Sequence, residues 1–288
     1  MGDAGRWAAG GKPCAASVRA HSKTVLRTFY DFHRDIGTRP VLKPVWRSDC
    51  TRPCCDGSDG EPTLIERILP SVAVAHHAFD DAVDAELFPQ EAAVVAAAVA
   101  ARRREFATVR RCARESLAEL GIPPMPLLPG ERGAPLWPRG TVGSMTHCLG
   151  YRAAAAARAD EITALGIDAE PHQPLPKGVL EMISLPEERA HLSSLGADRH
   201  WDRLLFSVKE SVYKTWFPLT HRRLDFRAAS VSFQPAERTF IAEFLVPGPR
   251  IGEDEVRRFH GRWLVDQGIV LTAIALLPAR PNLRQVAR

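Results

Sequence analysis

Long apolar runs are absent from this sequence. It has no stretch of about 18 consecutive apolar residues, which a membrane-spanning helix would require. The alanine-rich run at 92–101 is too short and too weakly hydrophobic for that role. The first 25 residues also contain no continuous apolar segment of the kind that a secretory signal carries. We therefore expect a cytoplasmic protein that has no membrane partner.

A strong excess of one charge is absent as well. The 38 Lys and Arg residues nearly balance the 34 Asp and Glu residues, and the formal net charge is +4. Residues 1–62 hold ten basic and seven acidic residues, so the rest of the chain is close to neutral. Proteins that bind nucleic acid commonly carry a marked basic excess. We therefore expect no nucleic-acid partner.

Paired cysteine motifs are missing too. A structural zinc site commonly uses two ligand pairs at close, regular spacing. The segment CTRPCC at 50–55 lacks this pair spacing, and no second ligand pair follows it. Thiols of a cytosolic chain stay reduced, and we expect Cys112 and Cys148 to be small buried residues. The six cysteines are Cys14, Cys50, Cys54, Cys55, Cys112 and Cys148.

The composition changes near residue 63. Residues 1–62 are rich in Gly, Pro, Arg, Asp and Ser and show little periodicity, which predicts a poorly ordered N-terminal extension. The apolar spacing that follows predicts an α+β protein with two lobes, each a small sheet and a helix. The predicted strands are 69–79, two within 141–159, one ending in GIDAE, 228–233, 238–246, 258–267 and 269–277. The predicted helices are about 90–120, 177–196 with Ser184 as a cap-like residue, and 200–217, which Pro218 should end.

Two acids end the strand GIDAE at 166–170. Asp168 and Glu170 lie two residues apart, so they share one face of the strand, while Ile167 and Ala169 should face the core. Two carboxylates on one face repel each other unless a cation lies between them. Carboxylate oxygens suit Mg²⁺. An isolated DxE pair is also common as a solvated strand edge, so this motif alone leaves both interpretations open.

Charged residues also gather on the helix at 200–217. Glu210 and Lys214 are four residues apart, as are Lys209 and Tyr213. A surface ion pair would explain this spacing. A carboxylate beside two lysines is also what a metal–pyrophosphate site needs, because lysines neutralise phosphate charge and the acid binds metal or accepts a proton. The predicted apolar face consists of Leu204, Leu205, Val208, Val212 and Trp216.

Two further groups of residues suit an anion. His147 follows the small hydrogen-bonding residues Gly143, Ser144 and Thr146, which would let a phosphate approach closely. Six arginines also lie within residues 102–114 with only Glu105 among them, and like charges at helical spacing repel. A bound anion would relieve that repulsion, although such a face is more often simply solvated. The arginines are Arg102, Arg103, Arg104, Arg110, Arg111 and Arg114.

Three segments together resemble the 4′-phosphopantetheinyl transferase superfamily, in its two-lobed, single-chain group. They are WPRGTVGSMTHCLGYRAA, GIDAEP and WDRLLFSVKESVYKTWFP, in this order. The segments RRREFATVRRCAR and GIPPMPLLPG add to the likeness, which covers about 85–277. It is strongest to the actinobacterial members that activate fatty-acid and polyketide carrier proteins. The resemblance implies pseudo-symmetric lobes at 63–164 and 165–280, each a small antiparallel sheet with a long helix, and a metal site where they meet.

The resemblance also implies a reaction. Such enzymes move 4′-phosphopantetheine from coenzyme A to a serine of an apo acyl or peptidyl carrier protein and release adenosine 3′,5′-bisphosphate. The pathways served are fatty-acid, polyketide, nonribosomal-peptide and siderophore synthesis, and a monomer is expected. By this resemblance Asp168, Glu170 and Glu210 bind Mg²⁺, or Mn²⁺ in its place, and Glu210 and Lys214 are catalytic. The residues expected to bind coenzyme A are Arg102, Arg110, Thr146, His147, Lys209 and Lys214.

The sequence departs from the family pattern at two places. Ala169 stands between the acids where many relatives carry another residue, and Pro129 stands where a basic residue near the adenosine phosphate is expected.

Two other functions use the same residue types. A Mg²⁺-dependent nuclease would need three acids and a lysine, but the near-neutral body and the order Lys209-Glu210 argue against it. A non-catalytic module that binds coenzyme A or a carrier protein would bind without turnover. Agreement of three motifs in order favours the transferase.

Overall fold

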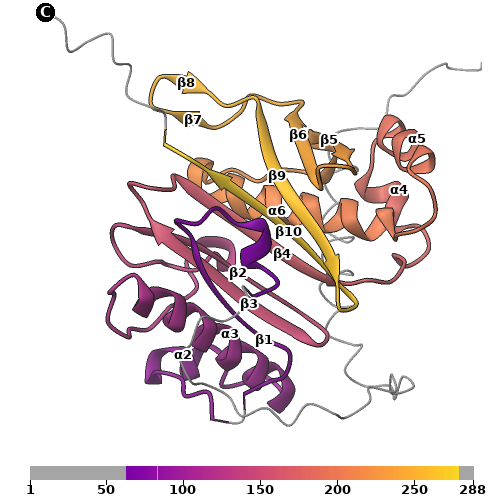
Figure 1. Cartoon of the computed structure of the whole chain (residues 1–288). Coiled ribbons are helices and arrows are strands. Elements are labelled where there is room, and N and C mark those ends of the chain that lie inside the picture. Colours follow the sequence, from indigo (N-terminus) through magenta and orange to yellow (C-terminus); the bar gives the residue numbers. More distant parts are fainter. Residues whose placement is uncertain (1–62, 83, 279–288) are drawn as a thin grey trace, which may run out of the picture. The chain divides into compact units, whose positions relative to one another are not determined.

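The computed structural model describes residues 63–82 and 84–278, and Figure 1 shows their arrangement. They form a mixed α+β structure with antiparallel sheets, which confirms the predicted fold class. The predicted N-terminal extension and four of the six cysteines lie outside the described residues. Within the described part, no helix is long and apolar enough to cross a membrane.

A three-stranded antiparallel sheet carries the first long helix. The strands follow the order β1-β3-β2, and α3 packs on the sheet with Cys112, Ala113 and Leu117 against Ala154 and Ala156 of β3. The small side chains of β3 let the helix come close to the sheet. The first elements are β1 (Val74–Ala78), α2 (Pro89–Val94), α3 (Ala100–Glu119), β2 (Thr141–Cys148) and β3 (Tyr151–Arg158), with short 3₁₀ turns η2 (Glu66–Ile68) and η3 (Glu131–Gly133).

A five-stranded antiparallel sheet carries the second long helix. Its order is β4-β10-β9-β6-β5, and α6 crosses one face (Figure 1). Every residue of the predicted apolar face of this helix is buried, which confirms that prediction. The elements are β4 (Ala164–Pro171), α4 (Val179–Ile183), α5 (Pro186–Ser194), α6 (Trp201–Thr220), η4 (Phe226–Ala228), β5 (Ala229–Gln234), β6 (Thr239–Phe244), β9 (Arg258–Asp266) and β10 (Ile269–Leu276), with a small ribbon of β7 (Arg250–Ile251) and β8 (Asp254–Glu255).

Hydroxyl groups join β2 of the first sheet to β4 of the second. Oγ of Ser144 accepts a hydrogen bond from the main-chain N–H of Ile167 at 3.0 Å. Oγ1 of Thr146 accepts one from Ala169 at 2.9 Å. Ile167 and Ala169 point into a core shared by both sheets, as predicted. The opposite face of β4, which bears Asp168 and Glu170, is therefore turned toward α6. The predicted division between residues 164 and 165 stays a prediction.

The close contact between β4 and α6 depends on Gly166. A Cβ atom at this position would lie 2.2 Å from Oγ1 of Thr215 and 2.4 Å from the carbonyl oxygen of Ser211. Both distances are far below van der Waals contact, so only glycine fits. Buried hydroxyls hold the next strand to the same helix, because Ser207 and Ser211 both lie 2.9 Å from Oγ1 of Thr272.

Two predicted helices are each divided in the structure. The helix predicted at about 90–120 forms α2 and α3, and the segment between them exposes Val99 and buries Val95. The helix predicted at 177–196 forms α4 and α5, because Pro186 has no N–H and begins a new helix. Ser184 is not its cap, because Leu185 occupies that position and the Ser184 hydroxyl donates to the carbonyl of Leu180.

Two other predicted boundaries were wrong. Pro218 does not end α6, which continues to Thr220 and stops at His221 in a left-handed conformation with φ 51°. One missing N–H in the last turn is tolerated because Leu219 still packs on the core. The strand predicted at 69–79 is only Val74–Ala78, since the segment before it forms a 3₁₀ turn and a second turn from Pro70 to Ala73.

Both cysteines in the described part are buried, as predicted. Burial raises the pKa of the Cys112 thiol to about 12. It also raises the pKa of Cys148, where the carboxylates of Glu170 and Asp168 add to the effect. Both thiols therefore remain protonated and unreactive at neutral pH.

Candidate active site

Asp168 lies at the centre of the candidate site. Lys214 of α6 donates a hydrogen bond to its Oδ1 at 2.7 Å, and the Thr146 hydroxyl of β2 lies 3.4 Å from the same oxygen. Among the described residues, its buried Oδ2 has no hydrogen-bond partner. An unpaired buried carboxylate oxygen is costly. This oxygen therefore marks a position at which a cation would be stabilised.

Glu170 and Glu210 interact electrostatically with Asp168. Burial and, next, the Asp168 charge raise the pKa of Glu170 to about 8, and Arg203 opposes this shift. Burial and, next, the Asp168 charge raise the pKa of Glu210 to about 7, and Lys214 opposes this shift. Glu210 also raises the pKa of Glu170. The structure thus brings the three predicted carboxylates, from β4 and α6, into one mutually repelling group.

The donor set of this group suits a divalent cation. Burial and the neighbouring Asp168 charge raise the pKa values of Glu170 and Glu210, and added positive charge would relieve this repulsion. Oxygen donors are also those that Mg²⁺ prefers. The unpaired Oδ2 of Asp168 agrees with this. However, within residues 63–82 and 84–278, no group of three or more His, Cys, Asp or Glu side chains is arranged so that it could hold a metal ion. A metal at this site therefore stays a proposal.

A second polar cluster joins α3 to β2. Nη1 of Arg102 lies 2.7 Å from Nε2 of His147, and the same Nη1 donates to Glu105 at 2.7 Å. Nε2 of His147 lies 3.2 Å from Glu105. The structure therefore brings two of the predicted coenzyme-binding residues together on a solvent-accessible surface. Their role in binding coenzyme A stays a prediction.

Arg110 lies deeper in the same helix. Its guanidinium carbon is 3.4 Å from the ring centre of Phe106, and its Nε donates to the carbonyl oxygen of Leu127 at 3.3 Å. Burial lowers its pKa to about 10, and the carboxylate of Glu91 opposes that shift. Through this hydrogen bond to Leu127, Arg110 anchors the loop that follows α3 to the helix. Its predicted contact with coenzyme A stays a prediction.

Lys209 does not join the carboxylates on β4. Its buried ammonium group lies 2.8 Å from Glu188 and donates to the carbonyl oxygens of Phe226 at 2.6 Å and Ala229 at 3.0 Å. These contacts use the three donors that a lysine has. Burial lowers the pKa of Lys209, and the Glu188 carboxylate opposes that change. Lys209 therefore links α6 to α5 and β5, and its predicted phosphate contact has no support in this geometry.

Sequence reasoning missed Arg203 and Glu188. Arg203 is buried and donates to Oε2 of Glu170 at 2.8 Å. A signal existed, because Arg203, Ser207 and Glu210 recur at spacings of four and three residues, which places them on one side of a helix. Glu188 had no comparable signal. The position of its partner Lys209 did indicate burial, because Lys209 lies four residues after the buried Leu205 and therefore on the apolar face of the helix.

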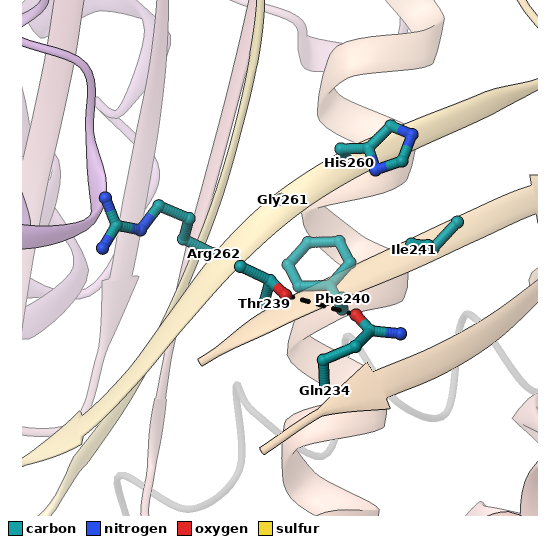
Figure 2. A pocket seen from close by; sticks show the side chains of 7 residues that line it. All are labelled: Gln234, Thr239, Phe240, Ile241, His260, Gly261 and Arg262. Carbon is teal, nitrogen blue, oxygen red and sulfur yellow. Dashed lines mark hydrogen bonds between the residues drawn. The ribbon is translucent and has the colours of Figure 1, made fainter. Parts of the chain in front are cut away.

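A groove of about 310 Å³ lies elsewhere, over β6 and β9. Figure 2 shows His260 and Arg262 on either side of Gly261, with the ring of Phe240 beneath. The groove exists because Gly261 has no side chain: a Cβ there would lie 2.1 Å from that ring. None of the predicted site residues lines it, so the groove is not part of the candidate active site.

Comparison with known proteins places the chain in a family. Residues 90–157 match the 4′-phosphopantetheinyl transferase N-terminal domain, and residues 164–268 match the 4′-phosphopantetheinyl transferase superfamily domain. The 4′-phosphopantetheinyl transferase Svp of Streptomyces mobaraensis is 58% identical over 219 residues, which cover 74% of this chain and 89% of Svp. PptT of Mycobacterium tuberculosis is 46% identical over 228 residues, covering 74% and 98%. Npt of Nocardia iowensis is 47% identical over 220 residues, covering 74% and 99%.

The two domain matches meet between β3 and β4, where the hydroxyls of β2 contact the strand that carries Asp168. Extensive identity to three transferases agrees with the family that the order of motifs in the sequence indicates. This chain belongs to the 4′-phosphopantetheinyl transferase superfamily, whose members use coenzyme A.

Proposed function

We propose that this protein transfers 4′-phosphopantetheine from coenzyme A to a serine of apo acyl and peptidyl carrier proteins, in a Mg²⁺-dependent reaction. The observation that carries the proposal is the unpaired, buried Oδ2 of Asp168 within a group of three interacting carboxylates. Family membership supports the same reaction. The protein acts as a monomer in the cytoplasm under this proposal.

In this reaction a P–O bond forms and another breaks. The serine oxygen bonds to the phosphorus next to the pantetheine arm, the bond from that phosphorus to the bridging oxygen breaks, and adenosine 3′,5′-bisphosphate leaves. The serine proton passes to a base. Such transfers depend mainly on positioning and on stabilising charge. When bound, Mg²⁺ would supply positive charge to the pyrophosphate oxygens, with Asp168, Glu170 and Glu210 holding it.

The side chains supply the remaining roles. Glu210 takes the serine proton directly or through a water. Lys214 is fixed beside Asp168 and offers positive charge to the leaving phosphate. Thr146 holds the main chain between the two acids through Ala169. Arg102 and His147 offer hydrogen bonds to phosphates of coenzyme A.

The mass of an apo acyl carrier protein tests the proposal. The carrier is incubated with this protein, coenzyme A and Mg²⁺, and its intact mass is measured. We expect a gain of one phosphopantetheine that disappears with EDTA and with Asp168→Ala. No gain on several carrier proteins, while coenzyme A still binds, would instead favour a binding module.

A further inference from the structure

Arg203 connects the candidate site to the loop that follows β4. It lies in the first turn of α6 and is buried. Its Nη1 donates to Oε2 of Glu170 at 2.8 Å. Its Nε donates to the carbonyl oxygen of Gln173 and its Nη2 to that of Pro174, both at 3.0 Å. One guanidinium group therefore binds a carboxylate of the site and two consecutive carbonyls of the loop.

The residues before Arg203 hold the same loop. Oδ2 of Asp202 accepts a hydrogen bond from the N–H of Leu175 at 2.7 Å. The N–H of His200 donates to Nε2 of His172 at 3.2 Å. The start of α6 thus fixes the loop from His172 to Leu175 at several points, and Glu170 is fixed to the same helix turn.

We propose that Arg203 is a positioning residue that sets the orientation of the Glu170 carboxylate for a divalent cation and ties that orientation to the loop at 172–175. This inference rests on the proposed function. Nη1 of Arg203 donates one charged hydrogen bond to Oε2 of Glu170, and the buried positive charge therefore fixes where that carboxylate oxygen lies. Partners of metal-binding side chains commonly change metal affinity 10- to 100-fold when they are removed.

A purely structural role would predict a different pattern. If Arg203 served only to hold the loop, its replacement would change stability and leave metal affinity unchanged. Lysine separates the two roles, because it keeps a positive charge for Glu170 but has no planar fork with which to reach both carbonyls as well. The response to lysine therefore distinguishes orientation of Glu170 from anchoring of the loop.

The test measures Mn²⁺ binding by electron paramagnetic resonance in the full-length protein with coenzyme A present. We compare wild type, Arg203→Met and Arg203→Lys, and we determine the KM for Mg²⁺ and for coenzyme A. Arg203→Met should weaken Mn²⁺ binding about 10- to 100-fold and raise the KM for Mg²⁺ more than that for coenzyme A. Arg203→Lys should recover most of the metal affinity.

Arg222→Met is the matched control. Arg222 donates to the carbonyls of Pro247 and Gly248 beyond the other end of α6, so its loss removes arginine–carbonyl contacts away from Glu170. It should leave Mn²⁺ affinity unchanged. Wild-type affinity in folded Arg203→Met would overturn the inference. If Arg203→Met fails to fold, Arg203→Gln replaces it with the same criterion. Failure of the wild type itself to bind Mn²⁺ would overturn the proposed metal-dependent function as well.

Discussion

Lys214 on α6 donates a 2.7 Å hydrogen bond to Oδ1 of Asp168 on β4 and a 3.0 Å hydrogen bond to the carbonyl oxygen of Ile167. The ammonium group is thus held at the strand by two acceptors. One oxygen of Asp168 is paired with a protein cation, whereas Oδ2 has no partner in the described part of the chain. The Asp168 carboxylate is therefore only half satisfied.

Glu210→Gln should lower kcat by about 10²- to 10⁴-fold, the range for loss of a general base. Coenzyme A binding should stay largely intact, because Glu210 contacts the reacting serine under the proposal. Calorimetry with coenzyme A and a steady-state assay would measure the two effects. Glu187→Gln, on the exposed surface of α5, is the control. Near-normal turnover of Glu210→Gln would refute its role as base and metal ligand.

Stabilisation by Mg²⁺ should increase with pH. The folded pKa values of Glu170 and Glu210 are raised to about 8 and about 7, above the unfolded value of 4.5. The metal-free native state then binds more protons than the unfolded state, so these groups reduce stability as pH rises from about 4.5 through about 8. Bound Mg²⁺ would favour the ionised forms.

Urea unfolding at pH 5.5 and pH 8, with Mg²⁺ or with EDTA, measures this effect. At each pH, the difference in unfolding free energy between Mg²⁺ and EDTA separates the effect of the carboxylates from that of histidines that titrate in the same range. We expect the gain from Mg²⁺ to be larger at pH 8 and to be lost in Asp168→Asn. An equal gain at both pH values would contradict the electrostatic account.

We expect Lys209→Met to lose mainly folding stability and Lys214→Met to lose mainly turnover. Loss of Lys209 leaves the Glu188 carboxylate buried without its cation, which should cost about 3–5 kcal/mol of folding free energy. Loss of Lys214 should reduce kcat and change stability less, because its side chain is more exposed. Urea unfolding midpoints and turnover numbers of both variants would separate the structural role of Lys209 from the catalytic role of Lys214. A stable, inactive Lys209→Met would restore a phosphate role for Lys209.

Glu91→Ala should destabilise the protein by about 3–5 kcal/mol without direct effect on chemistry. The fully buried Glu91 accepts hydrogen bonds from the N–H groups of Phe88 and Leu127 and pairs with Arg114 at 3.0 Å. Its loss removes the partner of both N–H groups and the carboxylate partner of Arg114, which keeps its hydrogen bond to the carbonyl oxygen of Glu86. Glu119→Ala removes an exposed contact with His76 and should change stability by less than about 1 kcal/mol. Equal losses in both variants would contradict the assignment.

Deletion of residues 1–62 should leave carrier-protein modification intact. The expectation comes from the composition of that segment, which lacks a sustained apolar pattern. Turnover of the shortened and full chains under the same conditions would test it. Loss of folding on deletion would show that the segment contributes to the structure.

Regular spacing made parts of the fold predictable. The apolar stripe of α6 and the alternation at Asp168 and Glu170 follow directly from helix and strand periods. The ends of elements were harder to predict, because Pro218 is tolerated through tertiary packing of the last turn. A local pattern carries no information on such long-range contacts.

Strand spacing placed Asp168 and Glu170 on one face, and the family resemblance added Glu210 to them. The structure brings the three carboxylates within electrostatic reach of one another, and their binding of a metal stays a prediction. A lysine satisfies a buried glutamate as readily as a phosphate, and only the fold reveals that Lys209 meets Glu188. Arg203 was overlooked because its partner lies 33 positions earlier in the chain.

The hydrogen bonds between β2 and β4 are made by two hydroxyl-bearing side chains, Ser144 and Thr146, in addition to the core that the two sheets share. Main-chain hydrogen bonds between paired strands form with most amino acids, because they do not use the side chain. The hydrogen bonds between β2 and β4 need a hydroxyl group, so one substitution can remove one of them. Such a change would leave the hydrogen-bonded interior of each sheet intact. Single substitutions at these two positions can therefore change how tightly the strand that bears Asp168 is bound, while the strand pairing within each sheet is kept.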